Sequence, residues 1–178
     1  MQEFTYVTGM VLKQTPIGEY DRRICLLTKE RGKISAFVRG SRKPGSRLSS
    51  ATNPFSFGVF KLHVGKNAYN VQEADIQNYF EDLRMDYIGA YYGMYFVEIS
   101  DYYTRENSDE KEMLRLLYQS LRALSVPSLS KELVRYIFEM KSIVINGEFP
   151  GLPVDWRLEA STEYAVQFIV NAPIEKLF

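Results

Sequence analysis

Two neighbouring runs of sequence decide the fold: Arg22–Thr28 (RRICLLT) and Lys33–Val38 (KISAFV), separated by the turn residues Arg31 and Gly32. In the second run polar and apolar side chains alternate, which is typical of a half-buried strand. Turn residues also bound three similar runs, near Phe4–Lys13, Phe55–Val64 and Tyr69–Asp75. The first part of the chain is therefore expected to be β-structure.

Five short strands within about 75 residues match a small closed barrel. A five-stranded oligonucleotide-binding (OB) barrel is favoured, because closure removes edges that so small a sheet would expose. An SH3-like barrel has a similar pattern and stays open as the alternative.

The apolar period becomes helical after about residue 83. Helices are expected over Asp86–Thr104, over Ser108–Ser125 with Asn107 or Ser108 as N-cap, over Leu129–Ile145, and near Ser161–Asn171. A further helix starting near Pro173 is cut short at Phe178. The predicted fold class is α+β: an OB barrel for nucleic acid in residues 1–80, then an all-α domain in 81–178 that is incomplete at its C-terminal end.

Composition limits the function classes further. The net charge is zero, but residues 1–80 carry +6 and residues 81–178 carry −6, so one half offers an electropositive surface. Neither a signal peptide nor a conventional transmembrane helix is visible, so no membrane partner is expected. A single cysteine excludes an intrachain disulfide and indicates a cytoplasmic protein.

Enzymatic signatures are weak, and the chain is not expected to be an enzyme. The only histidine, His63, lies in an alternating strand, which is typical of a surface or hydrogen-bonded imidazole. Cys25 lies in an apolar run and is expected in the core rather than as a reactive thiol. Neither a phosphate-binding glycine loop nor a metal-ligand pattern occurs, so no cofactor and no metal are expected.

The most informative stretch runs from Arg31 to Arg47 and holds six Lys and Arg residues without an acid. Strand alternation places Lys33, Ser35, Phe37 and Arg39 on one face. An aromatic ring between cations is what single-stranded nucleic acid requires, because bases stack on the ring while the cations follow the phosphates. The loop that follows, Ser41–Ser50, is expected to be mobile without a partner. The alternative interpretation is a solvated strand with a charged loop and a phenylalanine that packs under neighbouring side chains.

Other residues could widen this basic surface. Arg22 and Arg23 are adjacent in one strand, so at most one of them can face it. Lys13, Lys61 and Lys66 could extend it, although each is also consistent with an ordinary surface lysine.

The expected helix over 86–104 contains six tyrosines, from Tyr87 to Tyr103. At helical spacing most of them should pack in the core or between domains. The functional alternative is a groove that captures a partner peptide. This supports a second hypothesis, a non-enzymatic protein-interaction adaptor.

Several segments resemble the RecO family of bacterial DNA-repair proteins. They are Gly9–Asp21 (GMVLKQTPIGEYD), Leu26–Ala36 (LLTKERGKISA), Arg39–Leu48 (RGSRKPGSRL), Pro54-Phe55, Ile145–Gly147 (ING) and Pro173–Phe178 (PIEKLF). The resemblance covers nearly the whole chain.

The resemblance implies an N-terminal OB domain and a helical domain in a recombination mediator. Such a protein binds single- and double-stranded DNA, anneals strands, and with RecR assists loading of RecA, in the cytoplasm and associated with the nucleoid. The acidic C-terminal tail of the single-stranded-DNA-binding protein is implied as a partner of the helical domain, where Arg122, Arg135 or Lys141 could supply a basic spot. The residues expected to bind DNA are Lys33, Phe37, Arg39, Arg42, Lys43 and Arg47.

The chain departs from the family pattern in one place. Many members carry a four-cysteine zinc site after the helix that ends near Gly147, whereas this sequence has EFPGLPVDW at 148–156. A zinc finger is therefore excluded, and Leu152, Val154 and Trp156 are expected to hold the loop by apolar contacts.

Overall fold

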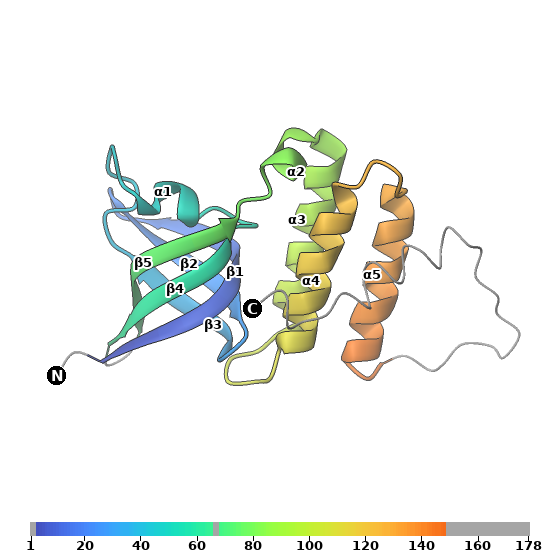
Figure 1. The fold of residues 1–178 in the computed structure, drawn as a ribbon. Coiled ribbons are helices and arrows are strands. Elements are labelled where there is room, and N and C mark those ends of the chain that lie inside the picture. Colours follow the sequence, from blue (N-terminus) through green and yellow to red (C-terminus); the bar gives the residue numbers. More distant parts are fainter. Residues whose placement is uncertain (1–2, 66–67, 149–178) are drawn as a thin grey trace, which may run out of the picture. The chain divides into compact units, whose positions relative to one another are not determined.

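The computed structural model describes residues 3–65 and 68–148. Their elements run in the order β1 (Phe4–Ile17), β2 (Asp21–Thr28), β3 (Gly32–Val38), α1 (Leu48–Ala51), β4 (Phe57–Val64), β5 (Tyr69–Asn78), α2 (Glu81–Met85), α3 (Tyr87–Tyr103), α4 (Lys111–Leu124) and α5 (Lys131–Ile145) (Figure 1). The described residues divide into two compact units, one with 3–80 and 104–114 and the other with 81–103 and 115–148. The expected helix near 161–171 and the anchors Leu152, Val154 and Trp156 lie outside the described residues.

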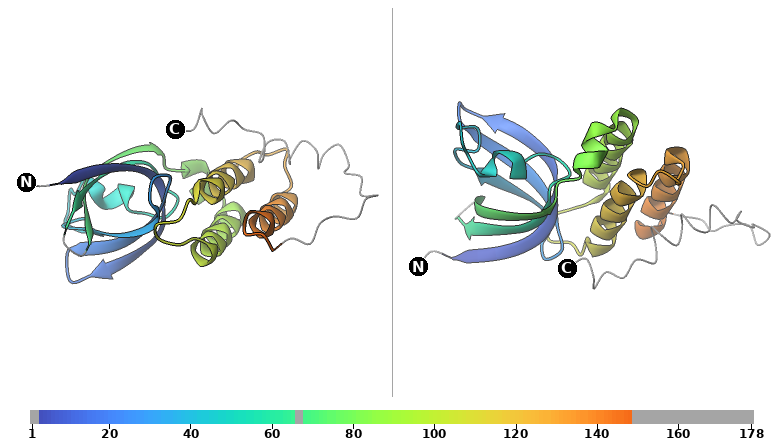
Figure 2. Two further views of the ribbon diagram at one scale, coloured as in Figure 1. Left: turned by 90° about the horizontal axis from the view of Figure 1, so that it is seen from below. Right: turned by 45° about the horizontal axis from the view of Figure 1, so that its top comes forward.

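The strands close into a barrel in the order β1-β2-β3-β5-β4, with the β3–β5 pair parallel and the others antiparallel (Figures 1 and 2). This is a five-stranded barrel of the OB type, followed by helices, so the predicted α+β class is confirmed. Strand β1 makes closure possible because its first half pairs with β4 and its second half pairs with β2.

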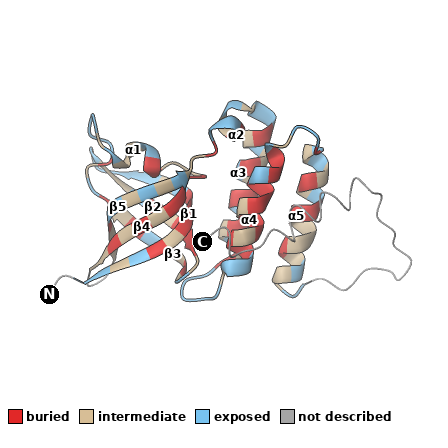
Figure 3. Cartoon of the chain, viewed as in Figure 1, coloured by how far each residue is buried: buried red, intermediate tan, exposed pale blue. Residues whose placement is uncertain are grey.

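The barrel interior holds the side chains that alternation assigned to it. The core consists of buried aliphatic and aromatic residues from every strand: Val7, Val11, Ile24, Leu26, Ile34, Ala36, Val38, Phe60, Leu62 and Val71 (Figure 3). Burial of each side chain larger than alanine in this set contributes about 1.5–3 kcal/mol. The same alternation turns the intervening side chains of β2 and β3 outward.

Residues 104–108 dock on the hairpin between β2 and β3. The Lys33 N–H donates to the Arg105 carbonyl at 3.0 Å, and the Asn107 N–H donates to the Arg31 carbonyl at 3.2 Å. Gly32 permits this approach, because a Cβ there would lie 2.5 Å from the Arg105 carbonyl oxygen. The docking also explains why neither Asn107 nor Ser108 caps α4, which begins at Lys111.

In the helical unit the rings of Phe96 (α3) and Phe138 (α5) stack at 4.1 Å between centroids, and both side chains are buried. Helix α3 begins after Asp86, whose Oδ1 accepts the Gly89 N–H at 3.0 Å, the usual geometry of an N-cap. The Asp86 Oδ2 also lies 2.9 Å from the Lys131 Nζ.

Asp86→Ala is expected to lower the free energy of unfolding by about 1 kcal/mol at neutral pH, because the cap is lost. The bond from the Gly89 N–H, followed by the contacts of Lys131, holds the pKa of Asp86 below its usual 3.8. A depressed folded-state pKa adds stability above the unfolded value, and this stability disappears as pH falls through the folded value. Urea unfolding should therefore show the difference at pH 7 and a smaller one below about pH 4. Glu98→Ala, at an exposed position within α3, is the control; equal losses for both variants would contradict the capping role.

None of the helices in the described part of the chain has the length and apolar character needed to cross a membrane.

Candidate nucleic-acid interface

A hollow of about 480 Å³ opens on the outer surface of the barrel beside β3. It is bounded by the ends of β1 and β2, by β3, and by the described residues around the β4–β5 connection. Its lining consists of Ile17, Asp21, Phe37, Arg39, Gly65, Ala68 and Asn70. OB barrels bind oligonucleotides across strands 2 and 3 and the loops that join strands 1–2 and 4–5. The hollow lies among these same elements.

Phe37 and Arg39 face this hollow together, as strand alternation predicts. Phe37 is half-buried and lies opposite Arg23 on β2 and Asn70 on β5. Arg39 is exposed, and none of the described residues forms a hydrogen bond or ion pair with its guanidinium. An aromatic face and an exposed cation therefore border one surface depression.

Asp21, the only carboxylate among the described lining residues, is already engaged in a hydrogen bond. Asp21 Oδ1 accepts the Gly40 N–H at 2.7 Å, which ties the end of β3 to the start of β2. This hydrogen bond stabilises the chain reversal after Arg39 and leaves the arginine side chain at the rim.

Arg42 and Lys43 pack against the β1–β2 connection rather than projecting from a separate loop. The Arg42 Nη1 donates to the Gly18 carbonyl at 3.1 Å, and the Arg42 N–H donates to the Tyr20 carbonyl at 2.9 Å. The Lys43 Nζ lies 5.5 Å from the centre of the Tyr20 ring. Both cations remain exposed, so the loop and the connection form one basic rim with an aromatic residue.

Arg47 and Lys33 lie apart from the hollow. Arg47 is exposed and immediately precedes the one-turn helix α1. Lys33 is half-buried at the other end of β3, opposite Leu27 and beside the docked Arg105. Among the residues expected to bind DNA, the structure thus brings Phe37 and Arg39 into one hollow and adds Arg42 and Lys43 at the β1–β2 connection. Lys33 and Arg47 lie outside the hollow.

Arg22 and Arg23, adjacent on β2, project to opposite sides of the strand, as alternation requires. Arg23 is exposed opposite Phe37, and no described residue pairs with its side chain. Arg22 points the other way, where its Nη1 donates to the Ser49 carbonyl at 2.8 Å and to Thr52 Oγ1 at 2.7 Å. Arg22 therefore fixes α1. Tyr20 was missed, because no strand pattern reaches the β1–β2 connection.

The described residues contain no group of three or more His, Cys, Asp or Glu side chains that could hold a metal ion.

The closed five-stranded barrel places the chain in the class of OB-fold proteins. Family models for the N-terminal and C-terminal parts of recombination protein O match residues 1–80 and 84–157. The chain belongs to the RecO family.

Similar proteins carry a consistent description. The DNA repair protein RecO of Bacillus pumilus is 32% identical over 144 residues, which make up 81% of this chain and 56% of that protein. Its counterpart in Bacillus cereus is 29% identical over 147 residues, covering 83% and 59%, and that of an Exiguobacterium species is 27% identical over 146 residues, covering 82% and 58%. The chain spans a little under three fifths of the length of these curated relatives.

Proposed function

We propose that this chain binds single-stranded DNA across the outer face of β2 and β3 and works as a recombination mediator rather than as an enzyme. The observation that carries the proposal is the hollow in which Phe37 and the exposed Arg39 lie between the β1–β2 and β4–β5 connections. Bases stack on aromatic side chains regardless of sequence, while nearby cations follow the phosphates. The names of the similar repair proteins support the same role.

The proposed contact residues are Phe37 for stacking and Arg23, Arg39, Arg42, Lys43 and Arg47 for phosphates. Lys33 belongs to this surface only if the strand continues along β3 toward the β2–β3 hairpin. Double-stranded DNA would bind through the same cations, because its phosphates need no exposed base. Annealing of complementary strands and assistance to RecA loading with RecR form part of the proposal.

Phe37→Ala tests the stacking role. Loss of the ring is expected to cost about 1–3 kcal/mol of binding free energy, or roughly 5- to 150-fold in affinity for a single strand. Fluorescence anisotropy with a labelled oligonucleotide measures the change. Phe37→Tyr keeps the ring and should retain affinity, so equal losses in both variants, or none in either, would contradict stacking at this position.

A second candidate function, capture of a partner peptide by the helical unit, is favoured by a stripe of exposed apolar and aromatic residues on α3. Tyr87, Tyr91 and Tyr102 are exposed by 86%, 72% and 81%, and Ile88 and Met94 lie beside them in sequence. The acidic tail of the single-stranded-DNA-binding protein is the proposed ligand.

Two of the residues expected to supply a basic spot, Arg135 and Lys141, lie on different sides of α5. Arg135 lies 3.6 Å from Glu139, and Lys141 follows six residues further along the helix. The peptide would therefore depend mainly on its apolar residues. Titration of a labelled acidic-tail peptide against Tyr87→Ala/Tyr91→Ala tests this role, and unchanged affinity would contradict it.

A further inference from the structure

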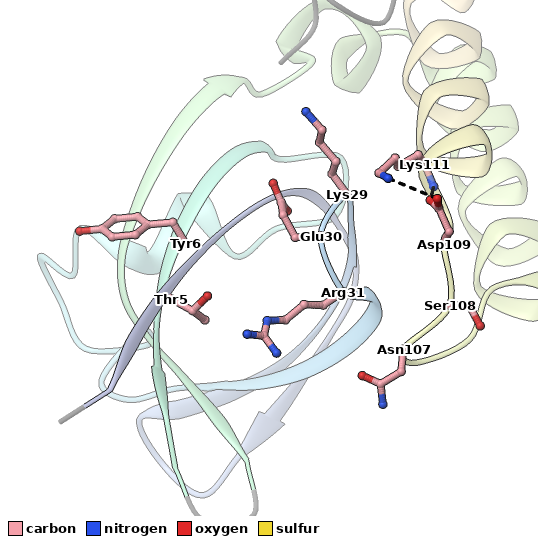
Figure 4. Close-up of a pocket in the computed structure, with 9 residues that line it drawn as sticks. All are labelled: Thr5, Tyr6, Lys29, Glu30, Arg31, Asn107, Ser108, Asp109 and Lys111. Carbon is pink, nitrogen blue, oxygen red and sulfur yellow. Dashed lines mark hydrogen bonds and ion pairs between the residues drawn. The ribbon is translucent and has the colours of Figure 1, made fainter. Parts of the chain in front are cut away.

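A second hollow, of about 580 Å³, lies at the other end of β1 (Figure 4). One side is formed by Thr5 and Tyr6 of β1 together with the hairpin residues Lys29, Glu30 and Arg31. The other side is formed by residues 107–109 and Lys111 of the segment that docks on this hairpin. Both sides belong to the barrel unit, and the two backbone hydrogen bonds that flank Gly32 hold them together.

The polar groups of this hollow favour an anionic ligand. Three cations, Lys29, Arg31 and Lys111, face two carboxylates, and both carboxylates already accept hydrogen bonds. Glu30 Oε2 accepts the Thr8 N–H at 2.8 Å. Asp109 accepts the Lys111 N–H at 3.3 Å and lies 3.2 Å from the Lys111 Nζ.

The guanidinium of Arg31 is held in place. It donates to the Tyr69 hydroxyl at 3.2 Å and lies 5.7 Å from the centre of that ring. A guanidinium carries five N–H donors in a planar fork, so one bond to a hydroxyl leaves donors that match a phosphate. Arg31 is therefore a positioned cation in the wall of the hollow.

An aromatic surface continues from the hollow across β1 and β4. Tyr6 is 61% exposed, and Phe4, two residues earlier on the same face of β1, is 43% exposed. The Phe4 ring makes an edge contact with His63 at 5.7 Å, and the Lys61 Nζ lies 5.4 Å from its centre. Rings beside cations form the arrangement that single strands bind.

This surface is separate from the proposed interface at β2 and β3. Tyr6 lies on the half of β1 that pairs with β4, whereas Ile17, in the first hollow, lies on the half that pairs with β2. Ile17 follows Tyr6 by eleven residues along β1, which corresponds to at most about 36 Å of extended strand. The barrel thus has two aromatic and basic hollows at opposite ends of its longest strand.

We infer that the hollow of Tyr6, Lys29, Arg31 and Lys111 binds a second segment of single-stranded nucleic acid while the first is held at β2 and β3. The inference rests on the proposed function, since it assumes that the first strand binds near Phe37 and Arg39. A protein with two such surfaces holds two strands together, which favours their pairing through a high effective concentration.

The test uses the whole chain and two non-complementary oligonucleotides of about ten nucleotides, labelled with a donor and an acceptor dye, a length within the range bound by one OB fold. Energy transfer reports two strands on one protein, and sedimentation of the same samples establishes that the complex contains one chain. Lys29→Ala/Lys111→Ala removes two cations from the second hollow, and Arg122→Ala/Lys141→Ala removes the same charge from the helical unit. Tyr6→Ala, at an exposed position, removes only the ring.

The wild type and the helical-unit control should bind two strands. Lys29→Ala/Lys111→Ala should bind the first strand with an affinity within about twofold of wild type. Its affinity for the second strand should fall roughly 25-fold at about 0.1 M salt, because each lost phosphate contact lowers log affinity by about 0.7 at that salt concentration. Tyr6→Ala should weaken the second strand alone. Annealing of complementary strands should slow in both variants.

Two strands bound equally by Lys29→Ala/Lys111→Ala and wild type would overturn the inference. A stoichiometry of one strand per wild-type chain would also overturn it. The inference would fail as well if Lys29→Ala/Lys111→Ala bound an acidic peptide more weakly than wild type but still bound two strands. Failure of the proposed function has a different signature, because the wild type would then bind no strand at all.

Discussion

Arg39→Ala/Arg42→Ala/Lys43→Ala should bind single-stranded DNA about 100-fold more weakly than wild type at about 0.1 M salt. Each phosphate contact contributes about 0.7 to the slope of log affinity against log salt, so the slope should also become less steep by about 2. The loss should be similar for unrelated sequences, since phosphates carry no base information. Anisotropy titrations over a salt series measure both quantities.

The matched control is Arg122→Ala/Arg135→Ala/Lys141→Ala, which removes the same charge from α4 and α5. It should leave DNA affinity within about twofold, because these residues belong to the helical unit and none of them is part of the proposed interface on the barrel. Equal losses in the two triple variants would show that net charge, and not the surface around β3, determines binding.

Gly32→Ala should destabilise the barrel unit by about 3 kcal/mol, because both the backbone conformation and the space at Gly32 exclude a side chain. Gly32 has φ +65°, which costs an alanine about 1–2 kcal/mol. The added Cβ would also lie 2.5 Å from the Arg105 carbonyl oxygen and 2.7 Å from that of Ser108. Residues 104–108 must then move away, and the hydrogen bonds of Lys33 and Asn107 weaken.

Gly18→Ala separates the cost of the backbone conformation from the cost of the steric contact. Gly18 also has positive φ, +57°, but a Cβ there meets nothing within 4 Å. Its substitution should cost only the backbone term of about 1–2 kcal/mol in urea unfolding. If Gly32→Ala cost no more than Gly18→Ala, the docking of residues 104–108 on the hairpin would be wrong.

The sequence predicted the barrel well because its signal is local. Ile34, Ala36 and Val38 alternate with Ser35 and Phe37, and the structure buries the first set in the core and turns the second set outward. The same rule required Arg22 and Arg23 to diverge, and they do: Arg22 binds the α1 region while Arg23 is exposed.

Features that depend on contacts distant in sequence were harder to predict. The helix that was expected from Ser108 begins at Lys111, because residues 104–108 pair with the β2–β3 hairpin some 75 residues earlier. Helices α1 and α2, of four and five residues, are too short to show a period.

The candidate site shows the same division. Alternation alone placed Phe37 and Arg39 on one face, and also Lys33, but it could not show that only the first two border the hollow. Tyr20 lies beside Arg42 and Lys43 through the β1–β2 connection, and Asn70 lies opposite Phe37 through the parallel β3–β5 pair. Neither contact follows from strand periodicity.

The central claim is that the barrel binds single strands through their phosphates, and a salt series with wild-type protein tests it most directly. Contact with about five phosphates predicts a straight line of log affinity against log salt with a slope of roughly −3.5. An affinity that does not change with salt, or no binding at about 50 mM salt, would contradict it.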